Sequence, residues 1–127
     1  MSPFKEKVIA IVRSIPSGKV VSYGQVGLYA GLPRAARQVG WILNGMEEQK
    51  EFPWWRVVNN KGHLSIRGTQ HNDKELQRKL LQAEGVVVSG DFTLPMETYR
   101  YAASAEELKR LQLPVDYIEF VISKYNI

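Results

Sequence analysis

The stretch from Pro53 to Arg56 is the clearest candidate for chemistry in this sequence. Trp54 and Trp55 are adjacent there, in a segment where helical periodicity ends. An indole offers a flat surface for stacking but is no nucleophile at neutral pH. The chain contains no cysteine, which excludes a thiol nucleophile, a disulfide and a thiolate metal site. The cluster therefore predicts binding by stacking and not covalent catalysis.

Arginines supply a second kind of chemistry. Arg37 lies early in a helical pattern, and Arg67 follows Trp54 by thirteen residues, with Gly68 beside it. A guanidinium is flat and permanently charged, so it can pair with a base, stack on one or contact a phosphate. From the residues alone, Arg37 could instead be a surface arginine that contacts phosphate or pairs with a glutamate. Arg67 could be a solvated charge in a loop.

Composition and charge narrow the class of partner. The net charge is +4, and residues 1–90 hold 13 basic and 7 acidic side chains, against 4 and 6 in residues 91–127. A basic body favours a polyanion partner, although many solvated surfaces look like this. His63 and His71 have no cysteine or carboxylate pair nearby, so we expect no metal and no cofactor. No apolar run could cross a bilayer and no secretion signal is present, so we expect no membrane association and a cytoplasmic protein, nucleoid-associated in a bacterium or nuclear in a eukaryote.

Periodicity predicts a mainly helical chain with short β pieces. The expected helices cover residues 3–14, 23–30, 34–46, 72–85, 104–111 and the segment after Pro114. Residues 19–23 are predicted as a strand or extended lead-in, 47–68 as a loop with short extended pieces, and 86–94 as a small hairpin. The second and third helices, joined by Gly31-Leu32-Pro33, form a helix-turn-helix pattern, which also occurs in proteins that bind no DNA.

Four segments in register resemble a known family. Val20–Val26, Pro33–Gly40, Pro53–Val58 and Leu80–Gly85 are similar in order and spacing to the DNA-binding, active-site domain of O6-alkylguanine-DNA alkyltransferases, over residues 3–94. In those enzymes a Pro-Cys-His-Arg-Val motif supplies the cysteine that accepts the alkyl group. Trp54 stands at the cysteine position here. The chain is therefore identified as a member of the alkyltransferase-like proteins.

The resemblance implies a fold and a function. The expected architecture is a winged helix-turn-helix-like DNA-binding domain at residues 1–94, with a helical C-terminal extension at 95–127 packed on it. The expected function is non-enzymatic recognition of DNA damage. A monomer would bind and flip O6-alkylguanine in duplex DNA, block alkyltransferases and mark the lesion for nucleotide excision repair proteins.

The resemblance also assigns roles on the helix-turn-helix. Arg37 corresponds to an arginine finger that fills the space left by the flipped base, and Tyr23 to a tyrosine that crowds the target phosphate. Ala35 and Ala36 would let the helix approach the minor groove closely, although helix propensity explains alanines as well. Tyr23 could equally be a half-buried residue packing on Trp41 or Trp55. Contacts to the DNA backbone are expected from Ser22, Arg34 and Gln38.

A second set of roles concerns the lesion pocket. Trp54 would line its floor or wall and Arg67 would stack on the modified purine, with Gly68 leaving room for the base. A core position for Trp54 is the alternative. Because neighbours alternate sides in an extended segment, we expect one of the two adjacent tryptophans to face the pocket. Trp55 replaces the family's histidine and is either core packing or pocket wall.

Three further positions are expected to be structural. Pro53 and Arg56 belong to the motif, and Arg56 would tie the loop to a helix. Glu84 corresponds to the glutamate of the enzymes' proton relay, which has no task without a thiol. Met46 stands where the family has a hinge asparagine.

Two functions of other classes stay open at this stage. The chain could be a helix-turn-helix transcription regulator that reads a defined operator, or a protein-interaction adaptor. The extension at 95–127 could pack on the domain or recruit another repair protein.

Overall fold

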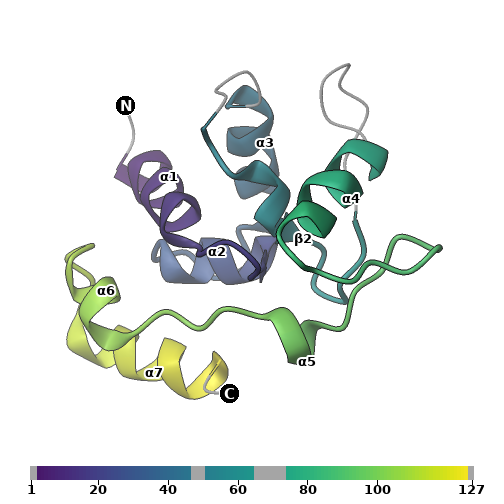
Figure 1. The fold of residues 1–127 in the computed structure, drawn as a ribbon. Coiled ribbons are helices and arrows are strands. Elements are labelled where there is room, and N and C mark those ends of the chain that lie inside the picture. The colour runs from purple at the N-terminus through teal and green to yellow at the C-terminus, as the bar shows by residue number, and fades with distance from the viewer. Residues whose placement is uncertain (1–2, 47–50, 65–73, 126–127) are drawn as a thin grey trace.

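Helices dominate the chain around two very short strands. The computed structural model describes residues 3–46, 51–64 and 74–125. Figure 1 shows the helices, which are α1 (Pro3–Ser14), α2 (Tyr23–Tyr29), α3 (Ala36–Gly45), α4 (Lys74–Ala83), α5 (Met96–Tyr99), α6 (Ala105–Lys109) and α7 (Val115–Tyr125). The strands β1 (Val21–Ser22) and β2 (Val57–Val58) pair in parallel, with Val21 opposite Val57. The predicted class, mainly α with short β pieces, is confirmed.

The first helix forms where the sequence places it. Pro3 occupies the first helical position, where its missing amide hydrogen costs nothing. Val8, Ile11 and Val12 recur at helical spacing and are buried on one face. The Ser14 hydroxyl donates to the Ile11 carbonyl at 2.6 Å in the last turn. This helix supplies one wall of the main core.

The helix α2 lies at the centre of the molecule. In Figure 1 it runs between α1 and α3 on one side and α6 and α7 on the other. Leu108 and Val121 of the C-terminal segment are buried in the same core cluster as residues of α1, α2 and α3. The Tyr117 hydroxyl donates to the Leu28 carbonyl at 2.5 Å. The C-terminal helices therefore complete the core beneath α2.

The chain leading to these helices is held by a buried glutamine. The Gln25 side chain is fully buried; its amide nitrogen donates to the Tyr101 carbonyl at 2.5 Å, and its oxygen accepts from Arg100 at 2.8 Å. The backbone of Val20 accepts from the Tyr101 amide at 2.8 Å and donates to the Tyr99 carbonyl at 2.9 Å. These bonds fasten residues 99–101 beside β1.

Some predicted elements differ from the observed ones. The third helix begins at Ala36, two residues later than predicted. Of the hairpin predicted at 86–94 only the turn forms, in which the Ser89 amide donates to the Thr93 carbonyl at 2.9 Å and the Phe92 amide to the Ser89 carbonyl at 3.0 Å. No strands flank it within these described residues, and Thr93 also forms an isolated antiparallel bridge with His63. The helix α5 has no counterpart in the prediction, because a four-residue helix carries too little periodicity to detect.

Candidate nucleic-acid interface

The helices α2 and α3 form a tight helix-turn-helix. The turn is closed by hydrogen bonds from the Gly31 and Leu32 amides to the Leu28 and Gly27 carbonyls at 3.1 and 3.0 Å. Gly27 allows α3 to approach closely, since a Cβ at this position would lie 3.1 Å from the Ala35 Cβ. The motif therefore presents α3 in a defined orientation.

The α3 helix has one buried and one exposed face. Val39 and Leu43 are buried, whereas Ala36, Arg37 and Gln38 are exposed in the first turn. Arg34 is also exposed, just before the helix, in a left-handed backbone conformation with φ of 62°. The start of α3 and the residue just before its cap thus present two arginines and a small side chain to solvent. This arrangement suits contact with a polyanion.

Two residues predicted to contact DNA are buried. Ser22 is fully buried and caps α2; its hydroxyl oxygen accepts from the Gln25 amide at 3.1 Å, and the Gln25 side chain accepts from the Ser22 amide at 3.4 Å. Ala35 is 2% exposed and packs toward Gly27. Both residues shape the helix-turn-helix, Ser22 through a capping box and Ala35 through a close helix contact. Their predicted roles in DNA binding stay predictions.

Tyr23 lies at the start of α2 and is half-buried. Its side chain packs against the main core cluster, and the predicted packing on Trp41 or Trp55 stays a prediction. Tyr23 therefore lies next to the first turn of the motif, and its predicted contact with a phosphate stays a prediction.

The two adjacent tryptophans differ from expectation in conformation. Residues Trp54–Arg56 form a short 3-10 helix and not an extended strand, so the argument from alternating sides does not apply. Trp54 is buried in the main core with 7% of its surface exposed, and its predicted place on the floor or wall of a lesion pocket stays a prediction. Trp55 is half-buried and meets Trp54 edge to face, with ring centroids 6.0 Å apart. This burial agrees with the core alternative for Trp54.

A polar network fixes this 3-10 helix to α4 and to the end of α1. The Arg56 guanidinium donates to the Glu84 carboxylate at 2.6 Å and to the Ile15 carbonyl at 2.7 Å. The Trp55 indole donates to the same carboxylate at 2.9 Å. The Gly18 amide also donates to this carboxylate, at 3.0 Å. Sequence reasoning expected Arg56 and Glu84 to be structural but did not pair Trp55 with Glu84.

The network also determines the charge state of Glu84. Burial alone would raise the pKa of its carboxyl, but hydrogen bonds from Arg56, the Gly18 amide and Trp55 outweigh burial and hold that pKa below its usual value. The carboxylate is therefore ionised at neutral pH and fully engaged as an acceptor. A buried glutamine, Gln77, adds a second tie by donating to the Trp55 and Val57 carbonyls at 3.1 and 3.0 Å.

The predicted lesion-stacking residues, Arg67 and Gly68, lie outside the described residues. The predicted metal-free state concerns the whole chain; among the described residues no group of three or more histidine, aspartate or glutamate side chains is placed to hold a metal. No helix in that part of the chain is long and apolar enough to cross a membrane.

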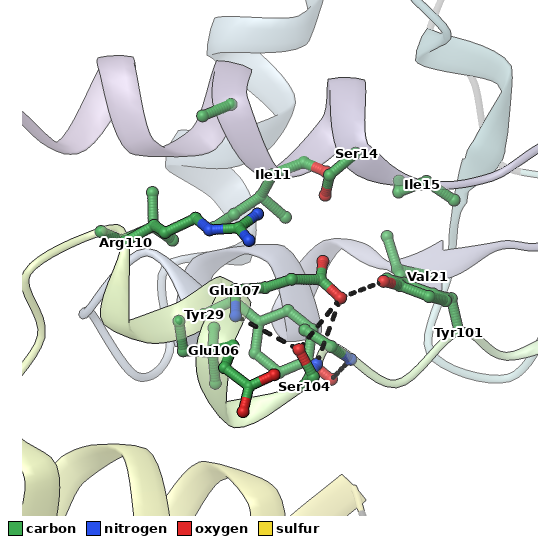
Figure 2. Close-up of a pocket in the computed structure, with 14 residues that line it drawn as sticks. Ile11, Ser14, Ile15, Val21, Tyr29, Tyr101, Ser104, Glu106, Glu107 and Arg110 are labelled. Carbon is green, nitrogen blue, oxygen red and sulfur yellow. Dashed lines mark hydrogen bonds between the residues drawn. The ribbon is translucent and has the colours of Figure 1, made fainter.

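A cavity of about 550 Å³ lies elsewhere, between α1 and the C-terminal segment. Figure 2 shows Ile11, Ser14 and Ile15 on one side and Glu107 and Arg110 on the other. The Tyr101 hydroxyl donates to Glu107 at 2.5 Å, and burial together with this hydrogen bond and the nearby charge raises the pKa of Tyr101 to about 12. None of the predicted DNA-contact residues lines this cavity.

Comparison with known proteins decides what the motif belongs to. The family described as "6-O-methylguanine DNA methyltransferase, DNA binding domain" matches residues 3–86. The chain belongs to this family. Within it, the chain is 46% identical over 98 residues to a protein of Escherichia coli named DNA base-flipping protein, a match that covers 77% of this chain and 74% of the relative.

Two further comparisons concern the alkyltransferase-like branch. Alkyltransferase-like protein 1 of Schizosaccharomyces pombe is 34% identical over 105 residues, covering 80% of this chain and 96% of that protein. A crystal structure of S. pombe Atl1 in complex with damaged DNA containing O6-carboxymethylguanine superposes with a TM-score of 0.74, at 34% identity, over 81% of this chain and 98% of that one. The predicted alkyltransferase-like resemblance and helix-turn-helix fold are confirmed.

One exposed residue of this family member was not singled out by sequence reasoning. Trp41 lies on α3 one turn beyond Arg37 and is 65% exposed. The signal was present in the sequence, because Val39, Leu43 and Met46 mark the apolar side of the helix and place Trp41 opposite them.

Proposed function

We propose that this protein is a non-enzymatic DNA-damage recognition protein. It binds O6-alkylguanine in duplex DNA as a monomer, turns the damaged base out of the helix and leaves the alkyl group in place. By occupying the lesion it blocks alkyltransferases and marks the site for nucleotide excision repair. The observation that supports this proposal most is that Arg37 is exposed on α3 of this family's DNA-binding domain, in a chain without a cysteine.

The surface proposed to contact DNA is the exposed first turn of α3. Its first turn exposes Arg37 between the small side chain of Ala36 and the polar Gln38, while Val39 behind them is buried. Turning a base out of a duplex breaks its stacking and pairing, which costs a few kcal/mol. A guanidinium that enters the vacated space can pair with the orphaned base on the other strand. Docking in the minor groove suits this role, because that groove carries little sequence information.

Alkyl transfer is excluded by chemistry at position 54. The reaction of this family requires a thiolate, and the chain has no cysteine at any position. The Glu84 carboxylate, which serves a proton relay in the resembling enzymes, is occupied here by Arg56, Trp55 and Gly18. The residues around position 54 therefore hold the scaffold together and supply no reactive group.

The captured base is proposed to lie beside the Trp54–Trp55 pair, with Arg67 stacked on it. Because Trp54 is only 7% exposed, little of its ring is available for stacking. The stacking partner in the proposal is therefore Arg67, whose cation–π contact with a purine contributes about 0.5–2 kcal/mol.

The test compares two duplexes that differ only in one O6-methyl group. Fluorescence anisotropy should show tighter binding to the methylated duplex, and mass spectrometry of the recovered DNA should show the methyl group retained. Equal affinity for the two duplexes would contradict lesion recognition. Loss of the methyl group would contradict the non-enzymatic assignment.

The comparisons do not favour the transcription-regulator alternative. The similar proteins are named DNA base-flipping protein and Alkyltransferase-like protein 1, and S. pombe Atl1 is solved in complex with damaged DNA.

A further inference from the structure

Trp41 is the most exposed large hydrophobic residue of α3. It is 65% exposed, whereas Trp54 is 7% exposed and Trp55 half-buried. Tryptophan is a residue that proteins bury on average. The other large apolar residues of α3 lie on its inner face. An indole exposed on the outer face of such a helix therefore suggests a binding surface.

The position of Trp41 on the helix matches that of Arg37. Residues four apart lie on one face of an α-helix, and Asn44 lies on the same face, on the other side of Arg37 from Trp41 around the axis. All three are exposed, and they face away from the buried Val39 and Leu43. The exposed face of α3 is therefore centred on Arg37, Trp41 and Asn44.

Duplex DNA is the occupant that these observations favour. Trp41 continues the face that carries Arg37, and Arg34 lies exposed just before the same helix, so the surroundings of the indole are cationic. The inference therefore rests on the proposed function, in which α3 docks on DNA. Another exposed aromatic residue, Phe120, is far from this face, because it lies on α7, which Figure 1 places across the molecule beyond α2.

The dimensions of helix and duplex agree. Four residues advance a helix by about 6 Å, a little less than two base-pair steps of about 3.4 Å each. An indole is flat, so it can enter a minor groove about 6 Å wide edge-on. Apolar side chains inserted between base steps from the minor groove unstack them and kink the duplex.

We propose that Trp41 is a second DNA-contacting residue on α3, an apolar wedge at a base step within two base pairs of the one that receives Arg37. Arg37 fills the space left by the flipped base, whereas the Trp41 indole inserts at a base step whose bases are both still paired. Trp41 therefore contributes equally to binding of damaged and undamaged duplexes, and it contributes to the bend.

The first test measures affinity and bend for Trp41→Ala, Trp41→Phe and Phe120→Ala, the last being an exposed aromatic on the far helix. Trp41→Ala should weaken binding to methylated and unmodified duplexes by the same factor, about tenfold. Trp41→Phe should keep most of the affinity, and Phe120→Ala should bind as the wild type does. Energy transfer between dyes at the duplex ends should show a smaller bend with Trp41→Ala.

A second readout locates the wedge on the DNA. The fluorescent base 2-aminopurine, placed at successive positions on either side of the lesion, brightens where stacking is lost. The wild type should brighten one step within two base pairs of the lesion, and Trp41→Ala should lose that signal.

The outcomes separate this inference from the proposed function. Unchanged affinity and bend in Trp41→Ala, with wild-type preference for the lesion intact, would overturn the wedge alone. A parallel loss on both duplexes, in a wild type that shows no lesion preference, would support the wedge and overturn lesion recognition. No wild-type binding to either duplex would overturn both. A change of oligomeric state on sedimentation of Trp41→Ala, with DNA affinity unchanged, would assign the indole to a second copy of the chain and overturn the wedge.

Discussion

Arg37 is the residue on which the recognition of a flipped base depends most. It is exposed in the first turn of α3, so its replacement should leave the fold intact. We predict that Arg37→Ala weakens binding to a duplex with O6-methylguanine by about 2 kcal/mol, or about thirtyfold, because the vacated space loses its filler.

The matched control is Arg110→Ala, which removes the same charge from the exposed end of α6. Anisotropy titrations of both variants should show a loss for Arg37→Ala only. An equal loss in the two variants would mean that general charge, and not position, determines the affinity.

Glu84 is the residue that secures the segment around Trp54. Its pKa is held below the usual value, so its contribution to stability is complete at neutral pH and is lost as the pH falls through the lowered pKa. We predict that Glu84→Gln lowers the free energy of unfolding at pH 7 by about 2 kcal/mol, because Arg56 loses its counter-ion in a largely buried site. Urea unfolding should show the difference from wild type shrinking below about pH 4.5.

A second glutamate–arginine pair provides the control. Glu75 pairs with Arg78 on the surface of α4, and the Glu75 side chain is 52% exposed. Glu75→Gln should change the free energy of unfolding by less than about 0.5 kcal/mol. If both variants lost the same stability, the buried network would have no special role.

At the scale of elements, the approach of α2 to α3 depends on a glycine. A Cβ at Gly27 would lie 3.1 Å from the Ala35 Cβ and 3.3 Å from the Leu32 carbonyl oxygen, whereas one at Gly24 meets nothing within 4 Å. We predict that Gly27→Ala lowers the free energy of unfolding by about 1 kcal/mol, since crowding outweighs the gain in helix propensity. It should also weaken DNA binding by displacing α3.

Gly24→Ala, on the same helix, should raise the stability by up to about 1 kcal/mol through propensity alone. Denaturant unfolding of both variants measures the difference. A stabilised Gly27→Ala would show that the turn can relax and that the close contact does not position α3.

Elements with strong periodicity or caps could be predicted from the sequence. The pattern of Val8, Ile11 and Val12 places α1, and the capping boxes at Ser22 and Ser104 place the starts of α2 and α6. Local sequence determines these features, because caps and amphipathic faces need only a few neighbouring residues.

The 3-10 helix at Trp54–Arg56 could not be predicted in this way. Its conformation depends on Glu84, which lies 28 residues after Arg56 and holds both Arg56 and Trp55. Extended and 3-10 backbones place adjacent side chains differently, so the burial of Trp54 depends on contacts that are distant in sequence. The argument from alternating sides failed for that reason, whereas Arg37 lies on a helix whose exposed face follows from its period.

At the scale of the molecule, the C-terminal segment belongs to the same core as the DNA-binding motif. Leu108 is 1% exposed and packs in the cluster shared by α1, α2 and α3. We predict that Leu108→Ala lowers the free energy of unfolding of the whole chain by about 2–5 kcal/mol, in a single transition. Val115→Ala, at a position 59% exposed, is the control and should change little.

Circular dichroism and tryptophan fluorescence, followed through the same urea titration, check this prediction. Coincident midpoints are expected, because the C-terminal helices carry helical signal and Trp54 reports on the shared core. Separate midpoints, with the fluorescence transition unmoved by Leu108→Ala, would make residues 95–127 an independent unit.

The central claim is that the damaged base leaves the helix while its alkyl group stays attached. A fluorescent cytosine analogue placed opposite O6-methylguanine measures this directly, because it brightens when its partner is removed. We predict that saturating protein brightens the analogue opposite the lesion, leaves it dark opposite unmodified guanine, and leaves the methyl group on the recovered strand. A bound complex in which the analogue stays dark opposite the lesion would contradict the claim.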